Sequence, residues 1–254
     1  MRSYLKIAAA LALVALIAVI TYQYIRIKRL IDKGHKLSQS AQAFERIDPQ
    51  ADFSMLVIGD SGAFGVGAAT PGESIIGKFG TAHPTISLEN RGHNGDRVAD
   101  LLETFQPASA APGKTTQRYD LLLIQIGGND VTHFTNLQQL EKDLGTLLDR
   151  AKMVSDHVYV LTSGDFVTAP LFPWPINYLF SWRYHRVRDL FLKTVPAHGA
   201  TYVDIFSYEE SHPVSGRDWD FYAADGFHPN GPGYQPWFEA LEFTLKQSGF
   251  SVPR

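Results

Sequence analysis

Apolar residues form three patterns along the chain: one long unbroken run, several short runs, and stretches with an apolar residue every three or four positions. The long run lies near the N-terminus. No charged residue occurs from Ile7 to Ile25, a stretch that as a helix can cross about 30 Å of hydrocarbon. Tyr22 and Tyr24 lie near its end, where interfacial aromatic residues are common. We therefore expect a single-pass membrane anchor over residues 1–30, followed by a polar stalk or linker over residues 31–52.

The flanks of this run leave its processing and orientation open. A buried core helix or a cleaved signal peptide would also explain the run, but the small-residue pattern Ala41–Ala43 lies too far beyond it for ordinary cleavage. Lys and Arg are more numerous after the run than before it, which by the positive-inside tendency favours a cytoplasmic domain. An ordinary signal anchor places the domain on the opposite side.

From residue 53 onward, short apolar runs alternate with helical patterns. Five runs are typical of buried strands, within residues 54–60, 85–90, 120–130, 157–165 and 200–206. Apolar residues at three-and-four spacing predict helices over 97–105, 137–151, 178–195 and 236–246. This alternation predicts one α/β domain over residues 53–254, with a parallel sheet covered on both faces. Ligands bind such sheets beyond the carboxyl ends of the strands.

Composition narrows the range of partners. The formal net charge of -3 gives no overall basic field, so no nucleic-acid partner is expected. The chain has no cysteine, which removes disulfides, thiolate zinc sites and cysteine nucleophiles. Its 9 histidines are scattered without a metal-binding pattern such as H-E-x-x-H, so no metal is expected.

Residues 167–184, VTAPLFPWPINYLFSWRY, are rich in proline and aromatic residues. An ordinary loop that covers part of the core would explain this composition. The segment would also suit an apolar wall or lid for a hydrophobic substrate near a bilayer. In that interpretation Trp174 and Trp182 line the substrate cleft.

The first sign of chemistry is the stretch GDSGAFGVGAA, which follows the first predicted strand. The triplet Gly59–Ser61 ends the apolar run, and three glycines follow within residues 62–67. Such a turn lets backbone approach either a phosphate or a reacting carbonyl. A dinucleotide fingerprint requires Gly or Ala where Thr70 stands, and no G-x-x-x-x-G-K-[ST] loop occurs. A serine nucleophile at Ser61 is therefore the better hypothesis.

The stretch AADGFHPNG near the C-terminus supplies a base for this serine. Asp225 stands three residues before His228, so its carboxylate can reach Nδ1 and leave Nε2 free to accept a serine proton. Two loops offer donors for an oxyanion, the Gly95 N–H and the Asn129 side-chain amide. Each motif alone is a common turn, but together they indicate serine hydrolase chemistry.

These motifs resemble the blocks of the SGNH (GDSL) hydrolase family. The four blocks are Gly59-Asp60-Ser61, Asn90-x-Gly92-x-x-Gly95-Asp96, Gly127-Gly128-Asn129-Asp130 and Asp225-x-x-His228-Pro229. The resemblance covers residues 54 to 247 and implies a flavodoxin-like three-layer α/β/α sandwich with no metal or organic cofactor. It also implies roles for the matched residues: Ser61 as nucleophile, His228 as general base, Asp225 as its orienting acid, and Ser61, Gly95 and Asn129 as the oxyanion hole.

Two positions depart from the family pattern. Gly62 and Ala63 replace the usual Leu-Thr pair, and the GVGA continuation resembles a branch attached to lipid or acyl-chain metabolism. His93 stands where a small apolar residue is usual, and it can either line the cleft or hydrogen-bond within its loop. The G-x-S-x-G elbow of α/β-hydrolases is absent. The departures bear on the substrate rather than on the chemistry.

The residues and the resemblance together predict a membrane-anchored serine esterase. We expect an ester or thioester of an acyl lipid as substrate, such as a lysophospholipid or a fatty acyl ester. A carbohydrate O-acetyl esterase and an acyltransferase with the same three residues remain alternatives. A binding module without activity is disfavoured, because it has no need of a complete Ser-His-Asp set.

Overall fold

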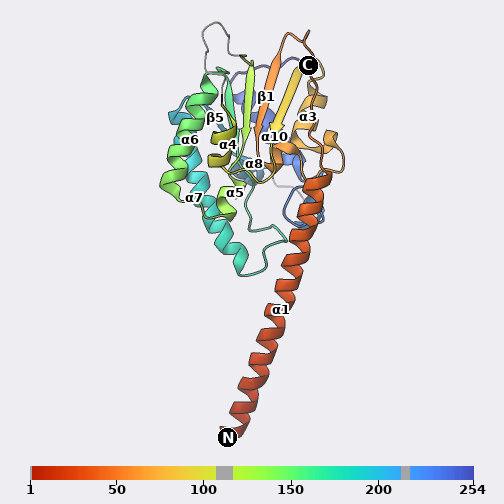
Figure 1. Ribbon diagram of the computed structural model, residues 1–254, viewed down its shortest axis with the longest axis vertical. Helices are drawn as coiled ribbons and strands as arrows, with labels where there is room; N and C mark the ends of the chain where they lie inside the picture. Colours follow the sequence, from red (N-terminus) through yellow and green to blue (C-terminus); the bar gives the residue numbers. More distant parts are fainter. Residues whose placement is uncertain (1, 107–116, 213–217) are drawn as a thin grey trace.

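A parallel sheet of five short strands organises the computed structural model, which describes residues 2–106, 117–212 and 218–254. The strands lie in the order β2-β1-β3-β4-β5 (Figure 1). Their bounds are β1 (Ser54–Gly59), β2 (Ser87–Gly92), β3 (Leu121–Gln125), β4 (Val158–Leu161) and β5 (Thr201–Val203). This is the order of flavodoxin-like folds, whose switch point lies between β1 and β3. The expected fold class is confirmed.

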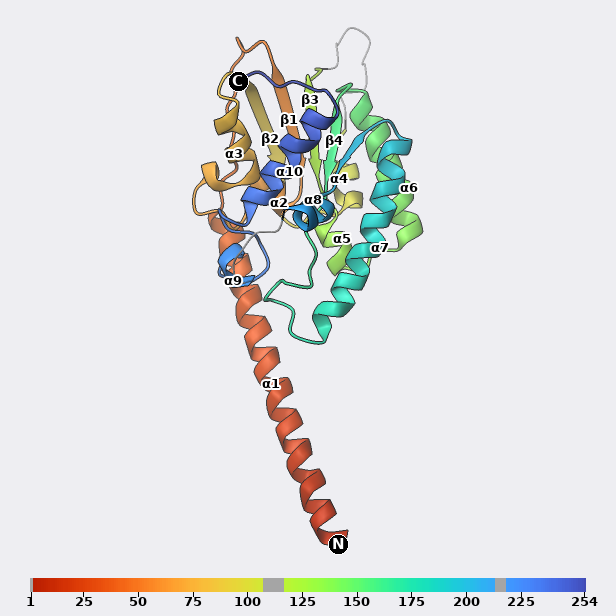
Figure 2. The ribbon, with the colours of Figure 1, turned by 180° about the vertical axis from the view of Figure 1, so that it is seen from behind.

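Alternate side chains of the strands face two separate apolar cores. Leu56 and Ile58 of β1 belong to one core, and Met55 and Val57 belong to the other. The first core is covered by α4 (Val98–Thr104), α5 (Gly128–Thr132), α6 (Leu137–Lys152) and α7 (Ile176–Ala197). The second is covered by α3 (Ile75–Ala82) and α10 (Tyr234–Gln247). Figure 2 shows α10 in front of the sheet and α3 at the side of β2. Each fully buried Leu or Ile adds about 1.5–3 kcal/mol of hydrophobic stabilisation.

The remaining helices are short and lie near the carboxyl end of the sheet. They are α2 (Ser61–Phe64), the 3₁₀ helix η1 (Pro71–Glu73), α8 (Ile205–Ser211) and α9 (Asp218–Phe221). The strand expected within 200–206 ends at Val203, since Ile205 and Phe206 already belong to α8. These helices bring loop residues over the switch point, where ligands bind in such sheets.

Helix α1 (Arg2–Ser40) projects from the domain and is continuous from one end to the other (Figure 1). Its first part is long and apolar enough to cross a membrane, and none of that window is buried. Its last third docks on the domain: Leu30 is buried, and Asn94 Nδ2 donates to the Ser38 carbonyl at 3.2 Å. The helix therefore continues through residue 30, where the sequence suggested a change from anchor to stalk.

The segment between α1 and β1 is also tied to the domain. Arg46 forms an antiparallel bridge with Leu88 of β2. Its guanidinium donates to the carbonyls of Gly80, His83 and Ile86. These contacts hold residues 41–52 along the edge of the sheet.

Candidate active site

Ser61 is presented by a tight turn between β1 and α2. Gly59 ends the strand at φ +147, where a Cβ atom would lie 1.9 Å from the Gln125 carbonyl oxygen. Only glycine allows this approach of β1 to β3. Asp60 then caps α2 by accepting from the Gly62 N–H at 2.9 Å. Ser61 is thereby the first residue of a helical turn, beyond the carboxyl end of the sheet.

Ser61, His228 and Asp225 form a hydrogen-bonded relay. The Ser61 Oγ lies 3.0 Å from His228 Nε2, and His228 Nδ1 lies 2.6 Å from Asp225 Oδ2. The other carboxylate oxygen, Asp225 Oδ1, accepts from the N–H groups of Phe227 and His228. This geometry lets the imidazole accept a serine proton while the carboxylate fixes its tautomer.

The surroundings of Asp225 favour its ionised form. Burial raises the pKa of this carboxyl, but the hydrogen bond and charge of His228, with the two backbone N–H groups, outweigh burial and bring the pKa below its usual value.

Two glycines allow close packing around the relay. A Cβ atom on Gly67 would lie 3.0 Å from His228 Cβ, and one on Gly34 of α1 would lie 3.1 Å from Asp225 Oδ2. The GVGA turn and α1 thus both contact this part of the site.

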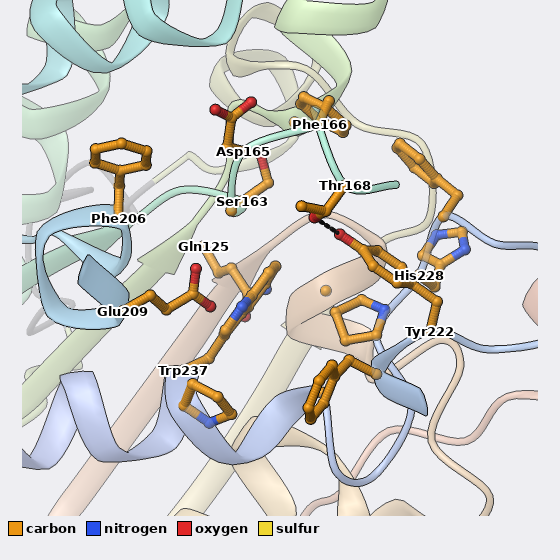
Figure 3. A pocket seen from close by; sticks show the side chains of 18 of the residues that line it. Gln125, Ser163, Asp165, Phe166, Thr168, Phe206, Glu209, Tyr222, His228 and Trp237 are labelled. Atoms are coloured by element: carbon orange, nitrogen blue, oxygen red, sulfur yellow. Dashed lines mark hydrogen bonds between the residues drawn. The ribbon is translucent and has the colours of Figure 1, made fainter. Parts of the chain in front are cut away.

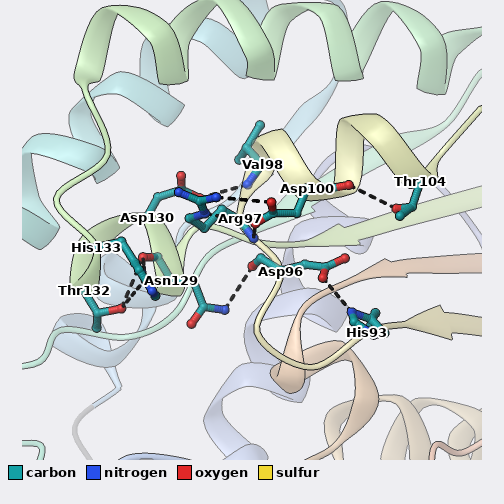
Figure 4. A network of polar contacts seen from close by, with 10 residues as sticks. All are labelled: His93, Asp96, Arg97, Val98, Asp100, Thr104, Asn129, Asp130, Thr132 and His133. Carbon is teal, nitrogen blue, oxygen red and sulfur yellow. Dashed lines mark hydrogen bonds and ion pairs between the residues drawn. The ribbon is translucent and has the colours of Figure 1, made fainter.

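Two loops hold the candidate oxyanion donors, the loop after β3 and the loop after β2. Asn129 Nδ2 donates to the Asp96 carbonyl at 3.0 Å, which ties the loop after β3 to the loop after β2 (Figure 4). Gly95, in the second loop, has a left-handed φ of +90, and its N–H has no hydrogen-bond partner among the described residues. Asp130 is fully buried and accepts from the Val98 N–H at 3.0 Å, which fixes the start of α4.

A cavity of about 440 Å³ opens beside Ser61 and His228 (Figure 3). Asn129 also lines it. Figure 3 shows Glu209, Trp237 and Gln125 at one end, and His228 and Tyr222 at the other. Tyr222 OH and Thr168 Oγ1 are hydrogen-bonded at 3.1 Å. Much of the wall is aromatic, with Phe166, Phe206, Phe221, Phe227 and Trp237.

Two acids in this cavity have strongly raised pKa values. Burial, and to a lesser degree the carboxylates of Asp130 and Asp96, raise the pKa of Asp60 to about 7, although the hydrogen bond donated by the Gly62 N–H lowers it. Burial and the nearby Asp165 carboxylate raise the pKa of Glu209 to about 7. Near neutral pH the cavity therefore carries less negative charge than it would if Asp60 and Glu209 were both fully ionised.

Three residues expected along the substrate cleft do not line this cavity, and that expectation is corrected. The His93 ring pairs with Asp96 at 2.6 Å and is 78% exposed. Trp174, just before α7, and Trp182, within α7, are also exposed, and neither belongs to the cavity lining. Of the segment 167–184, only Val167 and Thr168 belong to the lining.

The structure adds four polar or aromatic residues that sequence reasoning missed. Gln125 is buried, and its Oε1 has no hydrogen-bond partner among the described residues. The only signal for it is one polar residue at the end of an otherwise apolar strand. Ser163 follows β4, whereas Glu209 lies in α8 and Trp237 in α10, and none of the three belongs to a motif in the sequence. Among the described residues, no group of three or more His, Asp or Glu side chains could hold a metal ion.

The profile described as "GDSL-like Lipase/Acylhydrolase family" matches residues 57–235. A search of curated proteins found no match.

Several solved structures are similar to this one. LAE5, an alpha/beta hydrolase enzyme from the metagenome of Lake Arreo, Spain, has a TM-score of 0.59 at 20% identity, with 78% of this chain and 96% of that chain covered. The extracellular lipase from Streptomyces rimosus has a TM-score of 0.58 at 18% identity, covering 76% and 99%. Axe2, an acetylxylan esterase from Geobacillus stearothermophilus, has a TM-score of 0.55 at 19% identity, covering 80% and 97%. At these identities the likeness shows a shared fold.

Proposed function

The chain belongs to the GDSL-like lipase/acylhydrolase family and is a hydrolase of ester bonds, and on that premise we propose that Ser61, His228 and Asp225 are its catalytic triad. The observation that carries the proposal is the relay from Ser61 Oγ to His228 Nε2 at 3.0 Å, and from His228 Nδ1 to Asp225 Oδ2 at 2.6 Å. The relay opens onto the cavity, where an ester can reach it.

In the first half of the reaction, Ser61 Oγ attacks the ester carbonyl while His228 Nε2 takes its proton. The Asp225 carboxylate stabilises the imidazolium that forms. His228 then gives the proton to the leaving alcohol, and an acyl-Ser61 ester remains. In the second half, His228 takes a proton from a water molecule as the water oxygen attacks the acyl-enzyme carbonyl. His228 then returns this proton to Ser61 Oγ as the bond between Oγ and the acyl carbon breaks, which releases the acid and restores the Ser61 hydroxyl.

The negative oxygen of each tetrahedral intermediate requires preorganised donors. We assign this role to the N–H groups of Ser61 and Gly95 and to the Asn129 amide. One N–H of Asn129 Nδ2 is held by the Asp96 carbonyl. Because the amide nitrogen carries two hydrogens, the second remains available for the oxyanion.

The cavity favours an acyl ester larger than acetate. Its volume of about 440 Å³ and its aromatic wall suit an acyl chain, as in a fatty acyl ester or lysophospholipid. A carbohydrate ester is the second candidate, because Trp237 lines the cavity together with two groups that can accept hydrogen bonds from sugar hydroxyls. These groups are Glu209 and Gln125 Oε1, which has no hydrogen-bond partner among the described residues. The similar fold of the acetylxylan esterase is compatible with this second candidate.

The same proposal includes a membrane anchor formed by α1. Residues 7–22 are exposed and largely apolar, while Leu30 and Gly34 pack on the domain. A cleaved signal sequence would lose these contacts, so they support a helix that is retained. The protein is then a single-pass membrane esterase.

A chain-length series tests the substrate assignment. The full-length protein in mild detergent is assayed on p-nitrophenyl esters from acetate to palmitate, beside Ser61→Ala. We expect cleavage of medium and long chains and none by the variant. Cleavage of acetate alone would move the carbohydrate ester ahead. Equal rates for protein and variant would contradict the role of Ser61.

A further inference from the structure

The first turns of α7, together with Trp174 just before the helix, carry an unusually apolar exposed surface. Its members are exposed by 42–79% and are Trp174, Ile176, Tyr178, Leu179 and Trp182, named here the α7 patch. Tyr178 and Trp182 are four residues apart, so they lie on one helix face. Large apolar side chains gathered in this way usually mark a contact surface.

The contacts of α1 fix the position of this patch. Arg26 directly follows the uncharged run that ends at Ile25. Its guanidinium donates to the carbonyls of Pro170 and Leu171, in the loop that leads into α7. Both ribbon views show this loop and the start of α7 beside α1, as the part of the domain that reaches farthest toward the N-terminus (Figures 1 and 2). The α7 patch therefore lies level with the end of the apolar run.

The order of side chains along both helices matches that of a membrane boundary. On α1, the apolar run is followed by exposed Lys28 and Arg29. On α7, the patch is followed by exposed Arg186, whose guanidinium lies 5.7 Å from the centre of the Trp182 ring. Trp and Tyr favour the interface between hydrocarbon and water, and basic residues just outside it attract anionic headgroups.

We propose that the α7 patch is a second membrane-binding element, which docks in the headgroup region of the bilayer that α1 spans. The proposal rests on the membrane anchoring proposed above. The α7 patch binds an anionic lipid surface, because aromatic side chains and Arg186 lie together at the level where the apolar run of α1 ends. Docking holds the 169–175 loop against the bilayer. Thr168, which lines the cavity, directly precedes this loop, so a lipid ester would reach the site by a short path.

The chain offers a matched pair of tryptophan variants to test this. Full-length protein is reconstituted into phosphatidylcholine–phosphatidylglycerol vesicles, with and without bromine atoms on the acyl chains near the headgroup. Trp174→Phe/Trp182→Phe removes the two patch reporters. Trp219→Phe removes a control tryptophan that is 49% exposed, close to the 53% of Trp182. Trp237 stays in every protein as a common background.

We expect brominated lipid to quench about half of the emission of the unchanged protein, in which two of the 4 tryptophans dock, and about two thirds of the emission of Trp219→Phe, which lacks one undocked tryptophan. The reason is that docked indole rings lie about 5–10 Å into the boundary region. Trp174→Phe/Trp182→Phe should be quenched little. Equal quenching of both variants, or no quenching in protein that floats with the vesicles, would overturn the docking surface and leave the anchor standing. Protein that does not float with the vesicles would contradict the anchor and the docking together.

Discussion

Individual side chains of the site are held mainly by backbone groups. Asp225 is held by two N–H groups, and Asn129 is held by the Asp96 carbonyl. Asp60 fixes the turn that presents Ser61 by accepting from Gly62. Because the backbone supplies these contacts, one side chain can be changed while its neighbours keep their places.

Asn129→Ala should lower turnover and leave the fold intact. Loss of one oxyanion donor typically costs about 10²–10³ in kcat. The measurement is kcat on a medium-chain p-nitrophenyl ester, with circular dichroism as the check on folding. Unchanged turnover would remove Asn129 from the mechanism.

Asn136→Ala is the matched control, because this asparagine caps α6 and does not line the cavity. Its loss should cost about 1 kcal/mol of stability. Turnover should stay the same. The two variants thus separate an effect on chemistry from an effect on folding.

Asp60→Asn should change how stability depends on pH. The folded protein holds this proton up to a pKa of about 7, whereas the usual value is 3.8. The raised pKa therefore adds stability that is fully present below the usual value and is lost as pH rises toward 7, by up to about 1.4 kcal/mol per pH unit. Asn can still accept from Gly62 but does not titrate.

Urea unfolding of both proteins at a series of pH values checks this. The free energy of unfolding of the unchanged protein, relative to the variant, should fall from about pH 5 to pH 7 and then level off. Glu209 titrates in both proteins, so its effect cancels in the difference. Two parallel curves would show that Asp60 is ionised throughout this range.

Among the helices, α1 has a contact that a simple anchor does not need. A Cβ atom on Gly34 would lie 3.1 Å from Asp225 Oδ2, tighter than an ordinary contact. Gly34→Ala raises helix propensity, yet it should shift the carboxylate by a few tenths of an ångström. We expect about a tenfold loss of kcat, since misplaced catalytic groups are costly.

Gly72→Ala is the control for this substitution, because a Cβ atom there meets nothing within 4 Å. It should leave kcat unchanged. If Gly34→Ala also leaves kcat unchanged, α1 does not help to position Asp225.

The sequence was sufficient for the central architecture because each buried strand is a short apolar run and each long helix shows three-and-four spacing of apolar residues. The pattern of leucines over 137–151 and the observed α6 agree to within one residue. Helices α2 and α8 were missed because four to seven residues give too few turns for a periodic signal. The Ser61, Asn129 and Asp225–His228 blocks were recognisable because they occur together in one chain, and the first two follow predicted strands.

The rest of the site depends on contacts between distant segments, which leave no local pattern. Nothing in residues 31–40 indicates that Gly34 faces Asp225, nearly two hundred positions later in the chain. Gln125 and Glu209 reach the cavity from different elements. Trp174 and Trp182 were assigned to the cleft from composition alone, and composition does not tell which side of a helix faces the substrate.

Across the complete chain, the anchor and the domain are joined through one rigid helix. A chain that begins at Arg26 keeps the contacts of Arg26, Leu30, Gly34 and Ser38 with the domain. A chain that begins at Gln42 loses all of them. Loss of Leu30 burial alone costs about 1.5–3 kcal/mol.

We expect the Arg26 chain to cleave a water-soluble ester at the rate of the full-length protein. The Gln42 chain should be slower and should unfold at a lower temperature. The measurements are kcat and Tm in one buffer. Equal values for the two shortened chains would show that the docked part of α1 stabilises neither the fold nor the site.

Covalent labelling tests the central claim, that Ser61 is the nucleophile. The cavity holds a second serine, Ser163, whose buried Oγ has no hydrogen-bond partner among the described residues and which serves as the matched control. Full-length protein, Ser61→Ala and Ser163→Ala are treated with an alkyl fluorophosphonate, and the intact masses are measured. We predict one adduct on the unchanged protein and on Ser163→Ala, mapped to the peptide with Ser61, and none on Ser61→Ala. An adduct on Ser61→Ala, or its loss on Ser163→Ala, would contradict the proposed mechanism.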